Sequence, residues 1–163
     1  MVDGDMGDMD DGDVDSGDMG DMNMGDAVAT RADEVAGADL VSAQFGLLDT
    51  RPPGYDDVAG NAWLARHDMG TTVTLELTGL QPGISYIAHV HEGTCAEAGG
   101  DHFKFDPNGS EMPPNEIHLA FVGADDGRGF MTAENHAVVG ENARSVVVHP
   151  IELLDNKLAC AEF

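Results

Sequence analysis

Short apolar stretches, each ended by glycine, proline, asparagine or aspartate, constrain the fold of this chain more than any other feature. In residues 71–80, TTVTLELTGL, apolar and polar side chains alternate. Such alternation is typical of a β-strand with one buried face, because successive side chains of a strand point to opposite faces. No long stretch of the sequence repeats apolar residues with helical spacing. The pattern therefore predicts an all-β fold, either an antiparallel sandwich or a barrel.

The expected strands follow from the turn signals, of which QPG at 81–83 and ADDG at 124–127 are the clearest. We predict single strands at 61–68, 71–80, 84–92 and 145–150, and a hairpin over 117–134. The segment FGLLDTRPPGYDD, residues 45–57, is predicted to be a loop.

Residues 1–26 differ from the rest, since they are built almost wholly from Asp, Gly and Met. Such a segment lacks the apolar side chains that offset the cost of ordering a backbone. We therefore predict a disordered acidic tail at 1–26 and a folded domain at 27–163. Five of the methionines in the tail lie close together: Met6, Met9, Met19, Met22 and Met24. Thioethers suit Cu(I), so a copper-collecting tail is one interpretation and an acidic tether is the other.

The net charge of −24 argues against two classes of partner. Nucleic acids and anionic membrane surfaces would both be repelled. The sequence also lacks an apolar run near the ~20 residues of a membrane-spanning helix, and a signal-peptide pattern after Met1. We interpret the chain as the mature form of an exported protein, located outside the cell or at the cell surface. Its acidity, with only seven Lys and Arg residues, suggests a salt-loving organism.

Histidines supply the first chemical signal. His89 and His91 lie two positions apart in a predicted strand, so their rings point to one face, roughly 6.5 Å apart along it. Two further histidines stand in places that favour a shared ion, one in a glycine-flanked loop and one at the end of an apolar run. The full candidate set is His89, His91, His102 and His149. Imidazoles in a tetragonal array suit Cu(II), while zinc also accepts nitrogen. We interpret His67 and His136 as structural or solvated.

Cys95 and Cys160 are the two cysteines of the chain. They either form one disulfide or remain as two buried thiols, and their pairing is forced if they bridge. A bridge would indicate an oxidising compartment and hence export.

Four runs in series then resemble the copper/zinc superoxide dismutase family: GLQPGISYIAHVHEGTC, GGDHFKF, SVVVHP and KLACAEF. The resemblance covers roughly residues 58–163 and implies a Greek-key β-barrel, or flattened sandwich, of about eight antiparallel strands. It implies four copper ligands: His89, His91, His102 and His149. Of these, His102 would be the residue that links copper to zinc in the usual enzyme. It also implies a disulfide between Cys95 and Cys160.

The sequence departs from the family pattern at the zinc site. Residues 103–121 contain a single histidine, His118, and Phe121 stands where the family has an aspartate. Asp106 is a conceivable substitute, although its spacing does not require that role. We therefore do not expect a complete zinc site, and His118 is the remaining candidate zinc ligand.

Two further departures lie near the end of the chain. The family's long charged loop is nearly absent between His149 and Cys160, and Lys157 stands where the family usually has arginine. Together with the incomplete zinc site, the short loop resembles the copper-only branch of the family. Lysine keeps the positive charge but loses the planar fork of donors.

The function that the resemblance implies is copper-dependent dismutation of superoxide to oxygen and hydrogen peroxide. His102 would release copper and take up a proton in the reduced state, and Lys157 would attract and orient the anion. The alternative is a copper-binding buffer or delivery protein with this fold and without significant turnover. The acidic, methionine-bearing tail and the missing loop favour that alternative.

Overall fold

The computed structural model describes residues 25–163, and in this part of the chain all regular structure is β-strand except for two short 3₁₀ turns. The strands are β2 (Asp39–Leu47), β3 (Ala59–His67), β4 (Gly70–Thr78), β5 (Ser85–His91), β6 (His118–Val122), β7 (Gly129–Asn135), β8 (Ser145–Pro150) and β9 (Ala159–Glu162). The 3₁₀ turns are η1 (Ala32–Glu34) and η2 (Cys95–Glu97). The methionine cluster and most of the predicted tail lie outside the described residues. No helix of the described part is long and apolar enough to cross a membrane.

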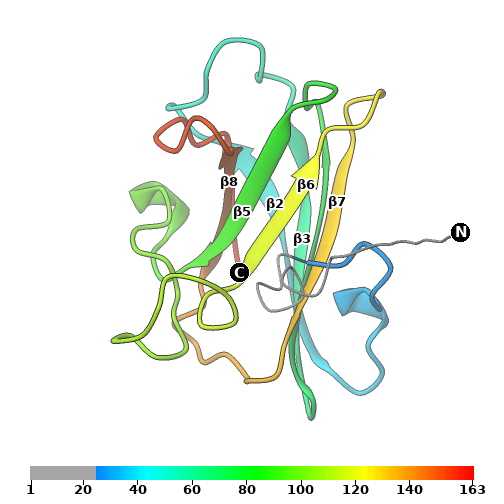
Figure 1. Cartoon of the computed structure of the whole chain (residues 1–163), viewed down its shortest axis with the longest axis vertical. Coiled ribbons are helices and arrows are strands. Elements are labelled where there is room, and N and C mark those ends of the chain that lie inside the picture. Colours follow the sequence, from blue (N-terminus) through cyan, green and yellow to red (C-terminus); the bar gives the residue numbers. More distant parts are fainter. Residues whose placement is uncertain (1–24) are drawn as a thin grey trace, which may run out of the picture.

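The eight strands form one antiparallel sheet that curls into a nearly closed barrel (Figure 1). Their order is β6-β5-β8-β9-β2-β3-β4-β7, and the two end strands, β6 and β7, also contact each other. The connections from β4 to β5 and from β7 to β8 pass between strands that are not neighbours. This gives the Greek-key arrangement that the resemblance implied, and the predicted all-β fold class is confirmed.

The core lies inside the barrel, and β4 shows how the sequence fills it. Val73, Leu75 and Leu77 alternate along this strand and are buried, as their spacing predicted. The opposite face of β4 is also covered, because η1 packs over it and the Ala32 amide donates to Thr74 Oγ1 at 2.9 Å. Residues ahead of the first strand therefore close one outer face of the barrel.

An arginine fastens this leading segment to the barrel. Arg31 forms ion pairs with Asp33 and Glu76, and its guanidinium carbon lies 4.9 Å from the Trp63 ring centroid. Asp26 lies in the predicted tail, but its amide donates to Thr132 O of β7 at 2.7 Å.

The prediction of a loop over 45–57 was wrong for its first three residues. Residues 45–47 end β2, where Phe45 pairs with Ala161 and Leu47 with Ala159 of β9. Most side chains of β2 are exposed or half-buried. The strand is therefore held by backbone pairing to β3 and β9, and it lacks the apolar alternation by which a strand is recognised in a sequence.

The hairpin predicted over 117–134 is correct in its turn but not in its pairing. β6 and β7 are joined by a turn in which the Ala124 amide donates to Arg128 O at 2.8 Å. The two strands do not pair with each other: β6 pairs with β5, and β7 pairs with β4. β6 and β7 contact each other but form no ladder, because they are the two end strands of the sheet and the barrel is not fully closed between them.

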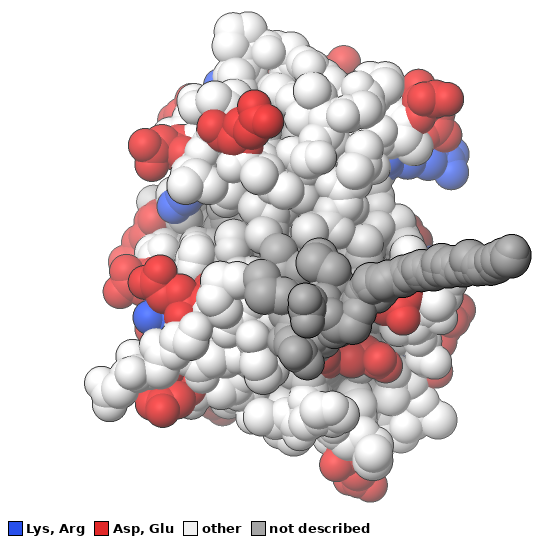
Figure 2. Space-filling model, viewed as in Figure 1, with Lys and Arg blue, Asp and Glu red and all other residues white. Residues whose placement is uncertain are grey.

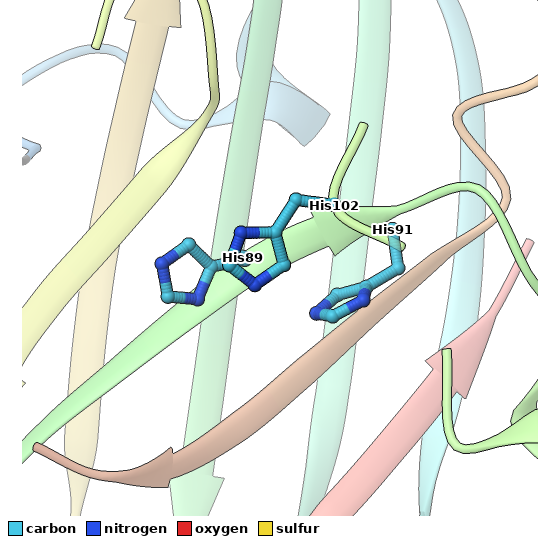
Figure 3. A group of neighbouring side chains, drawn as sticks. All are labelled: His89, His91 and His102. Carbon is cyan, nitrogen blue, oxygen red and sulfur yellow. The ribbon is translucent and has the colours of Figure 1, made fainter. Parts of the chain in front are cut away.

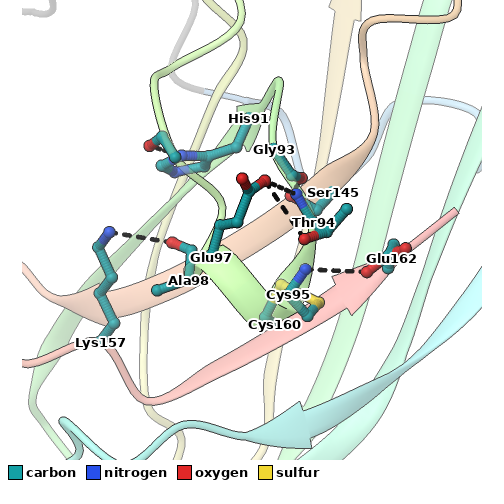
Figure 4. The surroundings of a disulfide bond; sticks show 11 residues. His91, Gly93, Thr94, Cys95, Glu97, Ala98, Ser145, Lys157, Cys160 and Glu162 are labelled. Carbon is teal, nitrogen blue, oxygen red and sulfur yellow. Dashed lines mark hydrogen bonds between the residues drawn. A yellow bond between two sulfur atoms is a disulfide. The ribbon is translucent and has the colours of Figure 1, made fainter.

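The disulfide between Cys95 and Cys160 is present, and it joins η2 to β9 across 65 positions of the sequence (Figure 4). The Cys95 amide also donates to Glu162 Oε1 at 2.8 Å. Thr94 and Glu97 cap η2 reciprocally. The loop that follows β5 is therefore fixed to the last strand of the barrel.

Removal of this crosslink should lower stability, because the disulfide restricts the unfolded chain over a long loop. Replacement of both cysteines by serine should reduce the free energy of unfolding by about 4 kcal/mol, measured by denaturant unfolding of the metal-free protein. An unchanged free energy would show that the crosslink does not stabilise the fold.

Candidate metal centre

Three histidines converge at one end of β5 (Figure 3). His89 and His91 lie on this strand, and His102 comes from the loop that follows it. One ring nitrogen from each of the three lies within 4.8 Å of the other two. The ring centroids of His91 and His102 are 4.7 Å apart, and those of His89 and His102 are 4.1 Å apart. This spacing allows all three rings to bind one ion.

The backbone, rather than a long side chain, brings His102 to this place. The loop after β5 turns back, and His102 forms an isolated antiparallel bridge with His91. The Phe103 amide donates to Val90 O at 2.8 Å, and the Glu92 amide to Asp101 O at 2.9 Å. These bonds pair residues 101–103 with the end of β5 and thereby bring the His102 imidazole to the site.

Gly99 permits the loop to pass this close to the site. Its φ of +87° is strained for other residues, and a Cβ there would lie 2.9 Å from the His91 ring and 2.6 Å from Val147 Cγ2. A glycine at this position therefore allows the loop that carries His102, the ligand loop, to pack closely against β5 and β8.

Hydrogen bonds to oxygen atoms orient three of the four candidate copper ligands. His91 Nδ1 donates to Gly100 O at 3.0 Å, and His149 Nδ1 donates to Pro150 O at 2.7 Å. His102 Nδ1 lies 3.0 Å from Glu116 Oε1. Carbonyl and carboxylate oxygens accept, so Nδ1 carries the proton in each ring. Nε2 is then left with its lone pair free, as a metal ligand requires.

His149 lies beside the group rather than within its tightest part. It is on β8, and its ring is stacked against that of His89 with 5.8 Å between the centroids. It is not part of the group whose nitrogens all lie within 4.8 Å of one another. The structure thus brings together three of the four histidines closely and places the fourth next to them.

Glu116 is the site residue that the sequence reasoning missed. Glu116 is 1 % exposed, and its Oε1 accepts hydrogen bonds from His102 Nδ1 and from His118 Nε2, the latter at 2.9 Å. A buried carboxylate needs such partners. The signal available in the sequence was the pair Glu116 and His118, two positions apart at the start of an apolar run, which repeats the spacing of His89 and His91.

The other residues considered for zinc lie apart from this cluster. Asp106 is on an exposed loop, where its Oδ1 accepts from the Asn108 amide at 3.0 Å. Phe121 is buried and stacks on Tyr86 with 5.7 Å between the centroids. Among the described residues, neither Asp106 nor Phe121 belongs to a group of neighbouring donors that could hold a metal ion.

The remaining histidines are elsewhere. His67 uses both ring nitrogens, since Nε2 lies 2.8 Å from Thr72 Oγ1 and Nδ1 accepts from the Met69 amide at 3.3 Å. His136 is exposed. These positions agree with their interpretation as structural or solvated residues.

Lys157 lines the same cavity as the histidines, which has a volume of about 340 Å³. Its ammonium donates to Ala98 O at 3.0 Å, and this bond joins the segment before β9 to the ligand loop (Figure 4). Glu111, Met112 and Leu154 also line the cavity. Its wall therefore presents a cation and an anion close to the imidazoles.

Burial keeps the imidazoles of His89, His91 and His149 neutral, which leaves them able to bind a metal. Desolvation, with a smaller effect from the neighbouring histidines, lowers the pKa of His89 from 6.5 to about 2. Desolvation also lowers the pKa of His91 to about 4, against the opposing hydrogen bond to Gly100. Burial lowers the pKa of His149, and the charge of Lys157 contributes.

These shifts make the stability of the metal-free protein depend on pH. Between pH 6.5 and about 4 the unfolded chain binds protons at His89 and His91 that the folded chain does not bind. The free energy of unfolding should therefore fall as the pH is lowered through this range. Denaturant unfolding at several pH values measures the slope. The variant His89→Gln should have a shallower slope, and an identical slope in the variant would contradict this origin.

Comparisons with known proteins show which solved structures have a similar fold. No family model matches the chain, and no curated protein matches it. Among solved structures, the Cu/Zn superoxide dismutase of Brucella abortus is similar with a TM-score of 0.55 and 18 % identity, over 76 % of this chain and 99 % of that one. A double mutant of a SOD-like protein from Bacillus subtilis is similar with a TM-score of 0.50 and 16 % identity, over 74 % of this chain and 95 % of that one. The chain thus has the fold of the Cu/Zn superoxide dismutases and carries a histidine-rich candidate metal site.

Proposed function

We propose that this protein is a copper-dependent superoxide dismutase of the copper-only kind. The observation that carries the proposal is the convergence of His89, His91 and His102 within 4.8 Å, with His149 beside them. Imidazole nitrogens are donors that suit copper. When bound, copper supplies one-electron exchange between Cu(II) and Cu(I), which dismutation requires and which zinc lacks. The reaction converts two superoxide anions and two protons to one dioxygen and one hydrogen peroxide.

His102 is the residue proposed to move a proton. It is the most exposed of the four histidines, with 38 % of its side chain accessible. Its Nδ1–H is hydrogen-bonded to Glu116, so Nε2 is the atom that would hold the ion or, in its place, a proton. The Glu116 carboxylate stabilises the positive charge of the ring when both nitrogens carry protons. Glu116 thus acts through His102 and is a positioning residue.

Lys157 is proposed to attract the anionic substrate. The protein as a whole repels anions, since its net charge is −24, and several acidic side chains lie on the face shown in Figure 2. A cation in the wall of the cavity opposes this repulsion at short range, where salt screens least. The position of Lys157 in the same cavity as the histidines supports this role.

Export is proposed for the same protein. A disulfide persists in oxidising compartments, and the structure contains one between Cys95 and Cys160.

The proposed activity is tested by superoxide decay in a stopped-flow spectrophotometer, with copper-loaded protein and a chelator that removes free copper. We expect rapid decay with the wild-type chain and background decay with His91→Ala. His136→Ala, which changes an exposed histidine away from the site, should behave as the wild type. Background decay with copper-loaded wild-type protein would contradict the proposal.

That last result would support the second candidate function, a copper buffer or delivery protein. The specific observation that favours it is the short connection of turns between β8 and β9, which leaves little chain around the cavity to guide an anion. Such a protein would bind copper through the same histidines but would leave superoxide at its background rate of decay.

The role of Lys157 predicts a selective kinetic defect. Lys157→Ala should slow turnover by about tenfold at low ionic strength and leave the copper content unchanged. Arg128→Ala is the matched control, because it removes an exposed cation of the turn between β6 and β7 and changes the net charge equally. Arg128 pairs with Asp126 and does not line the cavity of the histidines. Equal turnover in the two variants would remove Lys157 from the mechanism.

A further inference from the structure

The proposed function leaves the methionine-rich start of the chain without a role. Six of the nine methionines lie within residues 1–24, here called the methionine segment, which precede the described part of the chain. The segment also contains nine aspartates and no lysine or arginine. Dense negative charge raises the local concentration of cations, and thioethers are soft ligands that suit Cu(I). The segment thus combines attraction for cations with donors that select a soft one.

The methionine segment joins the folded domain at β7. The Asp26 amide donates to Thr132 O of this strand at 2.7 Å. The backbone of Gly25 lies so close to the strand that a Cβ there would be 2.8 Å from Met131 Sδ. These contacts fix residues 25 and 26 on β7. The methionines are therefore tethered to a defined point of the barrel.

Strand β7 leads from this point toward the cavity of the histidines. Thr132 and Asn135 are three positions apart, about 10 Å along the strand. Asn135 Nδ2 donates to Pro114 O at 3.2 Å, and Pro114 lies two positions after Met112. Because each of these steps is short, the tether point lies within roughly 30 Å of Met112.

The methionine segment is long enough to cover this distance. Met19 precedes Asp26 by seven positions and Met9 precedes it by 17. An extended chain spans about 3.3 Å per position, so Met19 can reach up to ~23 Å from Asp26 and Met9 up to ~56 Å. A donor on such a tether has an effective concentration in the millimolar range. Transfer of an ion to the cavity then needs no encounter between separate molecules.

Met112 places a further thioether in the cavity wall. It lines the same cavity as His102 and Lys157, and it is 42 % exposed. Its backbone is held by a turn, since its amide donates to Ser110 Oγ at 2.9 Å and its carbonyl accepts from the Asn115 amide at 3.1 Å. Its side chain is thus both open to solvent and beside the imidazoles, where a soft donor can receive Cu(I) from outside.

We propose that the methionine segment binds Cu(I) and passes it to the candidate copper site, with Met112 as the last thioether of the route. The delivery step rests on the proposed function of the histidines, whereas binding by the segment does not. The transfer is a ligand exchange: Cu–S bonds break as Cu–N bonds to the imidazoles form, and the ion remains Cu(I). The histidines are positioned in advance by strand register, which favours exchange toward them.

Cu(I) binding by the full-length chain tests the methionine segment. His91→Ala protein, in which the candidate copper site is broken, is titrated with Cu(I) without oxygen in competition with a chromophoric chelator. We expect bound Cu(I) with sulfur scatterers in its X-ray absorption spectrum. Leucine in place of the segment methionines should weaken this binding by about 100-fold or more, because direct ligands are lost. The five substituted positions are Met6, Met9, Met19, Met22 and Met24.

A matched variant separates the thioethers from the acidic charge. Asparagine replaces five aspartates of the methionine segment and leaves every methionine in place. This variant should keep the sulfur scatterers, because the direct ligands remain. The substituted positions are Asp3, Asp5, Asp8, Asp10 and Asp11.

The rate of copper loading tests the route to the histidines. Metal-free full-length protein receives Cu(I) from the chelator, and samples taken over time are oxidised. The nitrogen hyperfine splitting of the Cu(II) electron paramagnetic resonance spectrum then counts copper on imidazoles. The five-leucine variant and Met112→Leu should each load about tenfold more slowly than the wild type and reach the same final copper content. Met69→Leu is the control, because Met69 is 74 % exposed but does not line the cavity.

Two results would overturn the proposal. Cu(I) without sulfur scatterers in His91→Ala protein would reduce the methionine segment to an acidic tether. Equal loading rates of the wild type, the five-leucine variant and Met112→Leu would contradict the route. Superoxide decay enters neither measurement, so methionine-dependent loading of a protein without turnover supports the route while the proposed activity fails.

Discussion

The return of the loop onto the end of β5 is the constraint on which the candidate centre depends. β5 alone presents His89 and His91, and two imidazoles on a strand do not complete a metal site. The bridge between His102 and His91 supplies the third ring. Gly99 allows the close approach, and the Cys95–Cys160 disulfide fixes the start of the loop to β9. The site is thus built on strand register and backbone bonds, which hold ligands more precisely than side-chain contacts do.

Burial has two opposing consequences for the donors in this wall. It keeps His89 and His91 neutral by lowering their pKa values, which favours metal binding. It also makes the carboxylate of Glu116 costly unless its oxygens are occupied. Oε1 is satisfied by two imidazole N–H groups, and Oε2 is not satisfied by any described residue. The same low-dielectric environment therefore explains both the neutral state of these histidines and the need of Glu116 for hydrogen-bond partners.

The sequence predicted the features that depend on local spacing. Alternation in β4 and the turn signals indicated the all-β class, and the His-x-His pair with the single cysteine pair indicated the site. It did not predict β2, whose side chains are mostly exposed, because a strand held by backbone pairing has no apolar pattern. It also missed that β6 pairs with β5 and β7 with β4, and it missed the role of Glu116. Both depend on which strands become neighbours, and strand neighbours are set by the closure of the whole barrel.

The central claim is that the histidines from β5, β8 and the ligand loop bind one copper ion. The most direct test is a crystal structure of the copper-loaded protein with anomalous differences collected at the copper absorption edge. The account predicts an anomalous peak within coordination distance of Nε2 of His91, Nε2 of His102 and one ring nitrogen of His89, with His149 as the fourth ligand. A peak elsewhere on the chain, with these rings unliganded, would contradict it.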